Sequence, residues 1–87
     1  MEIKKSLDLL GHKAEDKITG FKGIIDSVSF DLYGCVQFLV RPPMDKANHV
    51  PDSMWFDGVR LKIITEKPVI PQPMFKYPKG PAQKPVI

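Results

Sequence analysis

The chain has 87 residues, of which 43% are hydrophobic and 26% are charged. These proportions are typical of a soluble globular protein, and a chain of this size buries only about 60 to 65% of its extended surface, so we expect one domain with a small core. The single cysteine, Cys35, excludes an intrachain disulfide. Cys35, His12 and His49 lie far apart and are too few for a zinc site, so we expect neither a metal nor a cofactor.

The net charge of +3 is unevenly distributed along the chain. Residues 1–66 carry nine lysines and arginines against ten acidic residues, whereas residues 67–87 carry four lysines and no acidic residue. The folded part is therefore expected to be nearly neutral, and the tail basic. Apolar runs are too short for a membrane span or a secretory signal, which favours a cytoplasmic protein without a membrane partner.

Residues 1–10 form a short lead segment. Ile3, Leu7 and Leu10 recur at helical spacing and are followed by Gly11, which predicts one or two helical turns that end there. So short a helix is marginal alone, so it must pack on another part of the molecule.

Residues 11–66 show the period-two alternation of short strands, interrupted by glycine and proline. In the first predicted strand Ala14, Asp16 and Ile18 share the inward face, and Thr19-Gly20 indicates a turn. We expect the buried carboxylate of Asp16 to be a structural clamp on backbone N–H groups of residues 19–23.

The second and third predicted strands form a hairpin. Ile24, Val28, Phe30 and Leu32 share the inner face of the second strand, and Asp26 interrupts that face, which predicts a bulge or bend there. After a turn at Tyr33-Gly34, apolar residues alternate over 36–40 until Pro42-Pro43 ends the third strand.

A polar loop over residues 44–53 precedes two short closing strands, 54–57 and 60–65, whose inner face is supplied by Leu61 and Ile63. Five short strands without a long helix predict a mostly β fold. We expect a five-stranded small antiparallel β-barrel, because closure removes open sheet edges.

Residues 67–87 contain six of the nine prolines and are predicted to be a basic, extended arm. A polyproline II conformation would reach roughly 60 Å from the domain. The tetrapeptide Lys67-Pro68-Val69-Ile70 recurs at residues 84–87. Between the two copies lie Met74, Phe75 and Tyr77, whose apolar character is typical of a docking segment.

Several of these features resemble known small barrels. Thr19-Gly20-Phe21-Lys22-Gly23, followed by Ile24-Ile25, is similar to the glycine-paired turn of the KOW-type barrel, which has a Src-homology-3-like fold. Together with Tyr33-Gly34-Cys35-Val36 and Trp55-Phe56-Asp57, it also resembles short uncharacterised proteins of tailed bacteriophages. The first resemblance implies binding to RNA, ribosomal or transcription partners, and the second implies a phage protein in the host cytoplasm or incorporated in a virion.

No arrangement in the sequence indicates catalysis, since no nucleophile lies beside a base and no pair of carboxylates is apparent. We interpret Cys35 as a structural or surface thiol and expect His12 and His49 to be solvated. Gly20 and Gly23 are expected to serve backbone conformation rather than phosphate binding.

Trp55, Phe56 and Tyr33 are candidates for an aromatic contact surface. Alternation places Trp55 and Phe56 on opposite faces, so one should be in the core and the other exposed. The candidate protein-contact residues are Trp55, Tyr33, Met74, Phe75 and Tyr77.

The sequence thus favours a non-enzymatic binding or assembly module that docks through its barrel and arm, as a homo-oligomer or part of a phage assembly. One alternative is a KOW-like nucleic-acid-binding protein that uses Lys22, Lys76 and Lys79 against phosphates. Another is a phage inhibitor or sponge that sequesters a host factor or a nucleotide signal.

Overall fold

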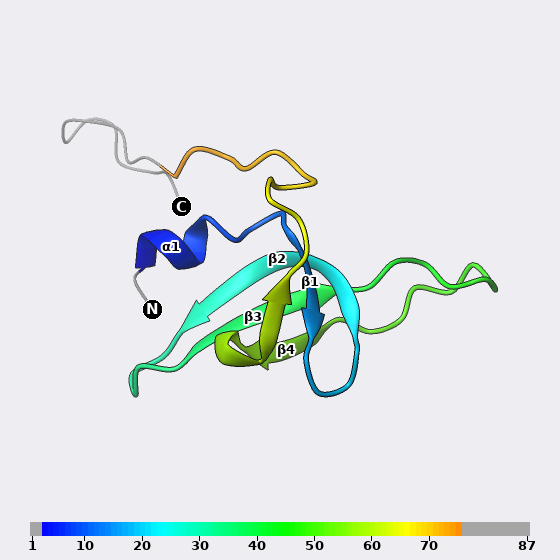
Figure 1. Ribbon diagram of the computed structural model, residues 1–87, viewed down its shortest axis with the longest axis horizontal. Helices are drawn as coiled ribbons and strands as arrows, with labels where there is room; N and C mark the ends of the chain where they lie inside the picture. The colour runs from blue at the N-terminus through cyan, green and yellow to red at the C-terminus, as the bar shows by residue number, and fades with distance from the viewer. Residues whose placement is uncertain (1–2, 76–87) are drawn as a thin grey trace, which may run out of the picture.

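The computed structural model describes residues 3–75. Five strands form one antiparallel sheet in the order β4-β3-β2-β1-β5, with one short helix beside it (Figure 1). The predicted mostly β architecture is therefore confirmed. No helix among the described residues has the length and apolar character needed to cross a membrane. The elements are α1 (Ile3–Leu7), β1 (Lys13–Asp16), β2 (Lys22–Phe30), β3 (Val36–Arg41), β4 (Met54–Asp57), the 3-10 helix η1 (Gly58–Arg60) and β5 (Leu61–Ile63).

The sheet is open rather than closed into a barrel. Within residues 3–75, β4 pairs only with β3 and β5 pairs only with β1, so β4 and β5 are the two edge strands. The single turn of η1 separates these two strands along the chain, and β5 crosses to pair with β1. A strand of four residues and a strand of three residues are short edges, which limits unwanted pairing with other chains.

The hairpin of β2 and β3 contains the predicted bulge. Ile25 lies opposite Val40 and Ser27 lies opposite Leu39, so Asp26 is the extra residue. The bulge reverses the alternation, and Ile25 is fully buried while Ile24 is only half-buried. The prediction that Ile24 supplies the inner face was wrong because the phase of the strand changes at Asp26. The same prediction for Leu32 was also wrong, because β2 ends at Phe30 and Leu32 is 89% exposed.

The core is small and lies on one face of the sheet. Phe56 is buried and Trp55 is 47% exposed, as their opposite faces on β4 require. Ile18 was expected to face inward but is 73% exposed, because β1 ends at Asp16 and the chain turns immediately. The buried hydrophobic residues are Ala14, Ile25, Phe38, Val40, Phe56 and Leu61.

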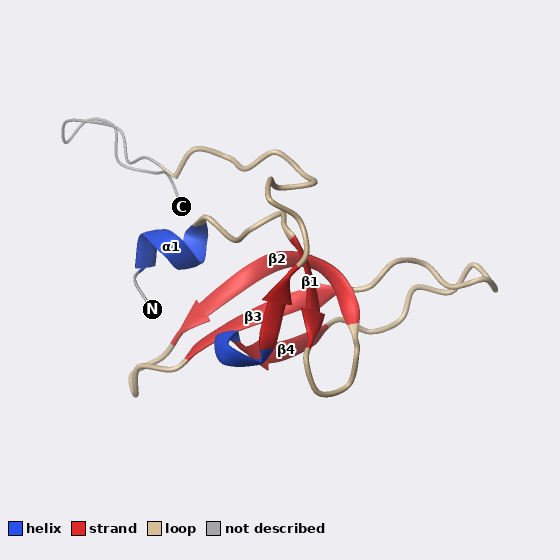
Figure 2. Cartoon of the chain, in the orientation of Figure 1, coloured by secondary structure: helices blue, strands red, loops and turns tan. Residues whose placement is uncertain are grey.

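Residues 64–75, which we call the strap, contain no helix or strand and return to the N-terminal segment (Figures 1 and 2). The backbone N–H of Val69 donates to the carbonyl oxygen of Gly11 at 2.8 Å. The side-chain amide of Gln72 donates to the carbonyl oxygens of Asp8 and Leu10, both at 2.7 Å. The same amide lies 3.4 Å from the carbonyl oxygen of Leu7 at the end of α1, and Ser6 within α1 is fully buried, so the short helix packs on another part of the chain. Residues 67–75 of the predicted arm therefore lie against their own domain.

Candidate binding surfaces

The turn between β1 and β2 is held by the carboxylate of Asp16, whose side chain is fully buried. One oxygen accepts hydrogen bonds from the backbone N–H of Thr19 at 2.9 Å and from its hydroxyl at 2.5 Å. Arg60 donates hydrogen bonds to both oxygens, with Nε 2.9 Å from Oδ1 and Nη2 2.7 Å from Oδ2. Such two-point pairing fixes direction as well as charge, so the turn and η1 are joined rigidly.

This environment shifts the ionisation of both partners. The hydrogen bonds from Arg60 hold the pKa of Asp16 far below its usual range, although burial opposes this shift. The same pairing raises the pKa of Arg60. Asp16 therefore stays ionised in the folded protein, and its role is to position Arg60 and the turn.

Beside this clamp lies a hollow of about 360 Å³, which we call the Trp55 hollow. Arg60 lies over the ring of Phe56 at 5.3 Å from its centroid, and the rings of Phe21 and Phe56 are 5.4 Å apart. Met54 and Trp55 form the exposed part of the lining on the edge strand β4. Because Arg60 is fixed by Asp16, the hollow is preorganised.

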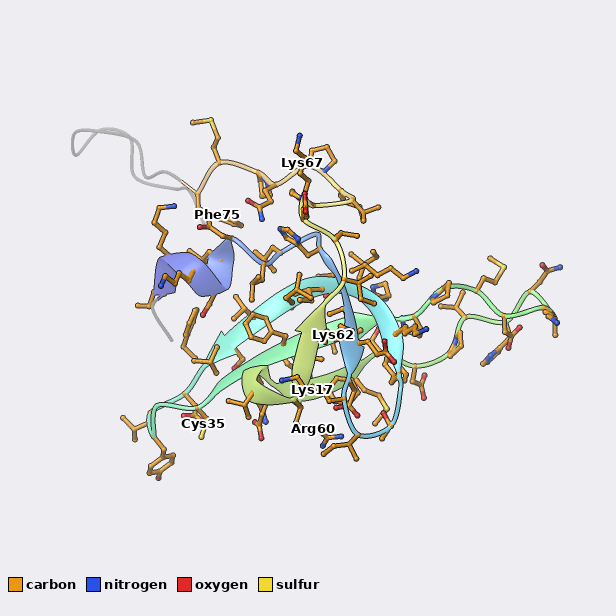
Figure 3. The ribbon with its side chains drawn as sticks, viewed as in Figure 1. Lys17, Cys35, Arg60, Lys62, Lys67 and Phe75 are labelled. Carbon is orange, nitrogen blue, oxygen red and sulfur yellow. The ribbon has the colours of Figure 1, made fainter. Side chains whose placement is uncertain are left out.

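Two loops are each organised by an aspartate carboxylate that accepts backbone N–H groups. Oδ1 of Asp31 accepts the N–H groups of Tyr33 at 2.9 Å and Cys35 at 2.8 Å, which leaves Tyr33 86% exposed. Asp45 organises residues 45–49 in the same way by accepting the N–H groups of Ala47 and His49. Figure 3 shows Cys35 at the tip of the β2–β3 hairpin, remote from Phe75.

A groove runs between the strap and the end of β3, and we call it the strap groove. Its volume is about 500 Å³. Ile24 lies between two walls, one made by Pro42 and Pro43 and the other by Val69 and Ile70. A smaller hollow of about 200 Å³ adjoins it, shares Ile24 and Ile70, and is bordered by Phe75. The lining is therefore mainly aliphatic and proline-rich, and Lys13, Asp26 and Arg41 add charged groups to it.

The outer face of β1 and its neighbours is cationic. Glu15 lies opposite Lys22 on β2 and opposite Lys62 on β5, so these three side chains share one face of the sheet. Lys13, two residues before Glu15, lies on the same face. All three lysines are exposed. This face carries an excess of positive charge that the near-neutral composition of residues 1–66 conceals.

The predicted contact residues do not converge on one site. The Trp55 hollow is lined by neither Tyr33 nor the strap residues Met74 and Phe75. Tyr33 lies in the turn between β2 and β3, whereas Phe75 is the last residue of the strap and is far from that hairpin turn in Figure 3. Tyr77, Lys76 and Lys79 lie outside the described residues.

The two histidines and the cysteine lie in different surroundings. His12 was expected to be solvated but is only 8% exposed, because its Nδ1 bonds the carbonyl oxygen of Thr65 in the strap at 2.9 Å. His49 is exposed beside Asp45. The thiol of Cys35 is exposed, and the negative charge of Asp31 raises its pKa, which keeps it protonated and weakly nucleophilic at neutral pH.

The backbone roles of two glycines are visible. Gly20 has a φ of 77° in the turn after β1, and a Cβ on Gly23 would collide with the carbonyl oxygen of Arg41.

Arg60 and Gln72 are the structurally important residues that the sequence analysis missed. An inward-facing Asp16 needs a countercharge, which was the available signal for Arg60, whereas no pattern indicated Gln72.

Comparisons of the chain with protein-family models, with curated proteins and with solved structures gave no match. The similarity to KOW-type barrels and to phage proteins therefore stays a prediction. Within residues 3–75, no three histidine, cysteine or acidic side chains are grouped so as to hold a metal ion.

Proposed function

We propose that this protein is a binding module that docks onto a neighbouring subunit through the Trp55 hollow. The observation that carries the proposal is a half-exposed tryptophan on an open sheet edge, beside a hollow whose arginine is already fixed. Tryptophan and arginine are the residue types most enriched among energetically dominant interface contacts. Preorganisation lowers the entropic cost of binding, which makes such a surface efficient.

The proposal includes a Src-homology-3-like fold for the domain. The strand order β4-β3-β2-β1-β5, with a 3-10 turn between the two edge strands, supports this assignment. Under the resemblance to phage proteins, the neighbouring subunits belong to a phage assembly, and the simplest partner is a second copy of the chain.

Sedimentation of the full chain over about a hundredfold range of concentration tests the proposal. We expect the mass to rise above that of a monomer, and Trp55→Glu to restore the monomer. Met44→Glu is the matched control, because Met44 is 57% exposed on the loop between β3 and β4, is not part of the lining of the Trp55 hollow, and gains the same charge. A mass that stays monomeric throughout, or a Trp55→Glu protein that associates like the native one, would contradict self-assembly through this surface.

A second candidate function, nucleic-acid binding, is favoured by the shared face of Lys13, Lys22 and Lys62. Neutralising phosphates with lysines releases counterions, so binding would be weak and would fall steeply with added salt. Fluorescence anisotropy of a labelled single-stranded oligonucleotide at several salt concentrations measures this dependence. We expect Lys62→Glu to reduce affinity, and unchanged affinity in that variant would argue against this face.

A further inference from the structure

The strap groove is lined mainly by apolar side chains, with Lys13, Asp26 and Arg41 as its charged members. Val69 and Ile70 form one wall, and Pro42 and Pro43 form the other. A groove of this composition favours a ligand that presents branched aliphatic and proline side chains. The chain contains such a segment outside the described residues, at positions 84–87.

We propose that residues 84–87 of the same chain bind in the strap groove. This segment, Lys-Pro-Val-Ile, is identical to residues 67–70, which already pack at this place through Val69 and Ile70. The duplicated tetrapeptide offers the same apolar side chains to the opposite wall and to Ile24. Burial of two branched aliphatic side chains would favour docking because it removes apolar surface from water.

The length of the intervening chain allows this return. Phe75 borders the smaller hollow that adjoins the groove, so residues 76–87 begin beside it. Val86 follows Phe75 by eleven residues, which span up to about 35 Å when extended. The five residues from Ile70 to Phe75 span at most about 18 Å. Such a return needs a reversal of chain direction, and proline and glycine at positions 78, 80 and 81 are residue types that turns favour.

The same tether favours the chain's own segment over that of a second copy. A short flexible linker gives an effective concentration in the millimolar range, on the order of 1 mM, which exceeds the working concentration of most proteins. Docking would close the groove, so an external aliphatic, proline-containing segment must displace residues 84–87 before it binds. The site is thus self-occupied, and it is separate from the Trp55 hollow.

Disulfide trapping in the full chain tests the proposal. Lys13→Cys, at an exposed position in the groove lining, and Lys84→Cys are introduced together with Cys35→Ser, so that the two new thiols are the only ones and every aliphatic and proline side chain of the groove and of residues 84–87 is kept. A disulfide requires Cα atoms within about 7 Å, which a docked segment satisfies far more often than a free one. The matched control carries Ile87→Asp in addition, which removes one aliphatic contact without altering residues 3–75.

We expect the intrachain disulfide to form at least about tenfold faster in the first protein than in the control, as expected if docking contributes about 1.4 kcal/mol or more. Equal rates in the two proteins would show that residues 84–87 do not dock and would overturn the proposal. A product that joins two chains would identify a second copy as the occupant and would also overturn it. A single cooperative thermal transition in each of the two reduced proteins would verify that both are folded. Neither outcome alters the sedimentation test of the Trp55 hollow.

Discussion

Two contacts join segments that are far apart in the sequence, and they use different chemistry. Asp16 and Arg60 form a two-point ion pair in which the Asp16 side chain is fully buried. Gln72 instead donates neutral hydrogen bonds to backbone carbonyls of the N-terminal segment, at an exposed position. A buried charge that loses its partner is strongly destabilising, whereas an exposed amide can exchange its partners for water. The first contact should therefore behave as a fixed joint and the second as a releasable one.

Among the substitutions that test the two contacts, removal of Arg60 should reduce thermal stability most. Arg60→Met leaves the buried carboxylate of Asp16 without its countercharge, so we expect the thermal midpoint to fall by about 10 °C or more. Lys62→Met is the control, because Lys62 is an exposed cation on the adjacent strand. Differential scanning calorimetry provides the measurement. Similar midpoints for the two variants would show that the clamp is not a fixed joint.

This joint illustrates what the sequence could predict. Period-two alternation was enough to place Asp16 on the inward face and to place a clamp at the turn after it. Its principal partner, Arg60, is 44 positions away, and only the pairing of β5 with β1 brings the two together. Tertiary pairing of this kind leaves no local pattern, which is why the arginine was missed.

The errors on Ile24 and Ile18 have a local cause instead. Alternation predicts a face only while the strand continues in one phase, and it fails on one side of the bulge at Asp26 and beyond the end of β1. The contacts of the strap could not be predicted from the sequence for another reason. A proline-rich composition excludes helix and interior strand but does not say whether an extended segment is free or packed.

Acidification should distinguish the two contacts by their pH dependence. The pKa of Asp16 is lower in the folded than in the unfolded state, so its contribution to stability is complete above the unfolded value of about 3.9 and is lost as the pH falls below it. We expect Asp16→Asn to be less stable than the native protein at pH 7, and the difference to shrink toward low pH. Thermal midpoints measured from neutral to strongly acidic pH test this. A difference that is constant with pH would contradict the ionised clamp.

Gly11→Ala should cause an intermediate loss of stability, because the new side chain would press on the strap. Gly11 has a φ of 86°, and a Cβ there would lie 2.5 Å from the carbonyl oxygen of Ile70. We expect a loss of about 1–3 kcal/mol in the free energy of unfolding, measured by urea titration. Gly34→Ala is a matched control, since its φ of 84° is nearly the same but no atom lies within 4 Å of the added Cβ. Equal losses at the two glycines would mean that the strap yields without resistance.

The smallest effect should come from Gln72→Ala, with a loss of about 0.5–1.5 kcal/mol for the amide contact. Gln37→Ala is the matched control, because Gln37 donates an exposed hydrogen bond to Asp57 outside the strap. Amide hydrogen exchange of Val69 should accelerate in the first variant and not in the second, since the N–H of Val69 bonds Gly11 within the strap.

Gln72→Glu makes this last test more specific. An ionised carboxylate cannot donate a hydrogen bond, and the carbonyl oxygens of Asp8 and Leu10 would repel it. We expect it to accelerate exchange at Val69 more than Gln72→Ala does at neutral pH, and less once the new carboxyl is protonated. The second effect follows because a protonated carboxyl can donate one hydrogen bond again. If alanine and glutamate gave the same exchange rate at neutral pH, the amide of Gln72 would not be what closes the strap over α1.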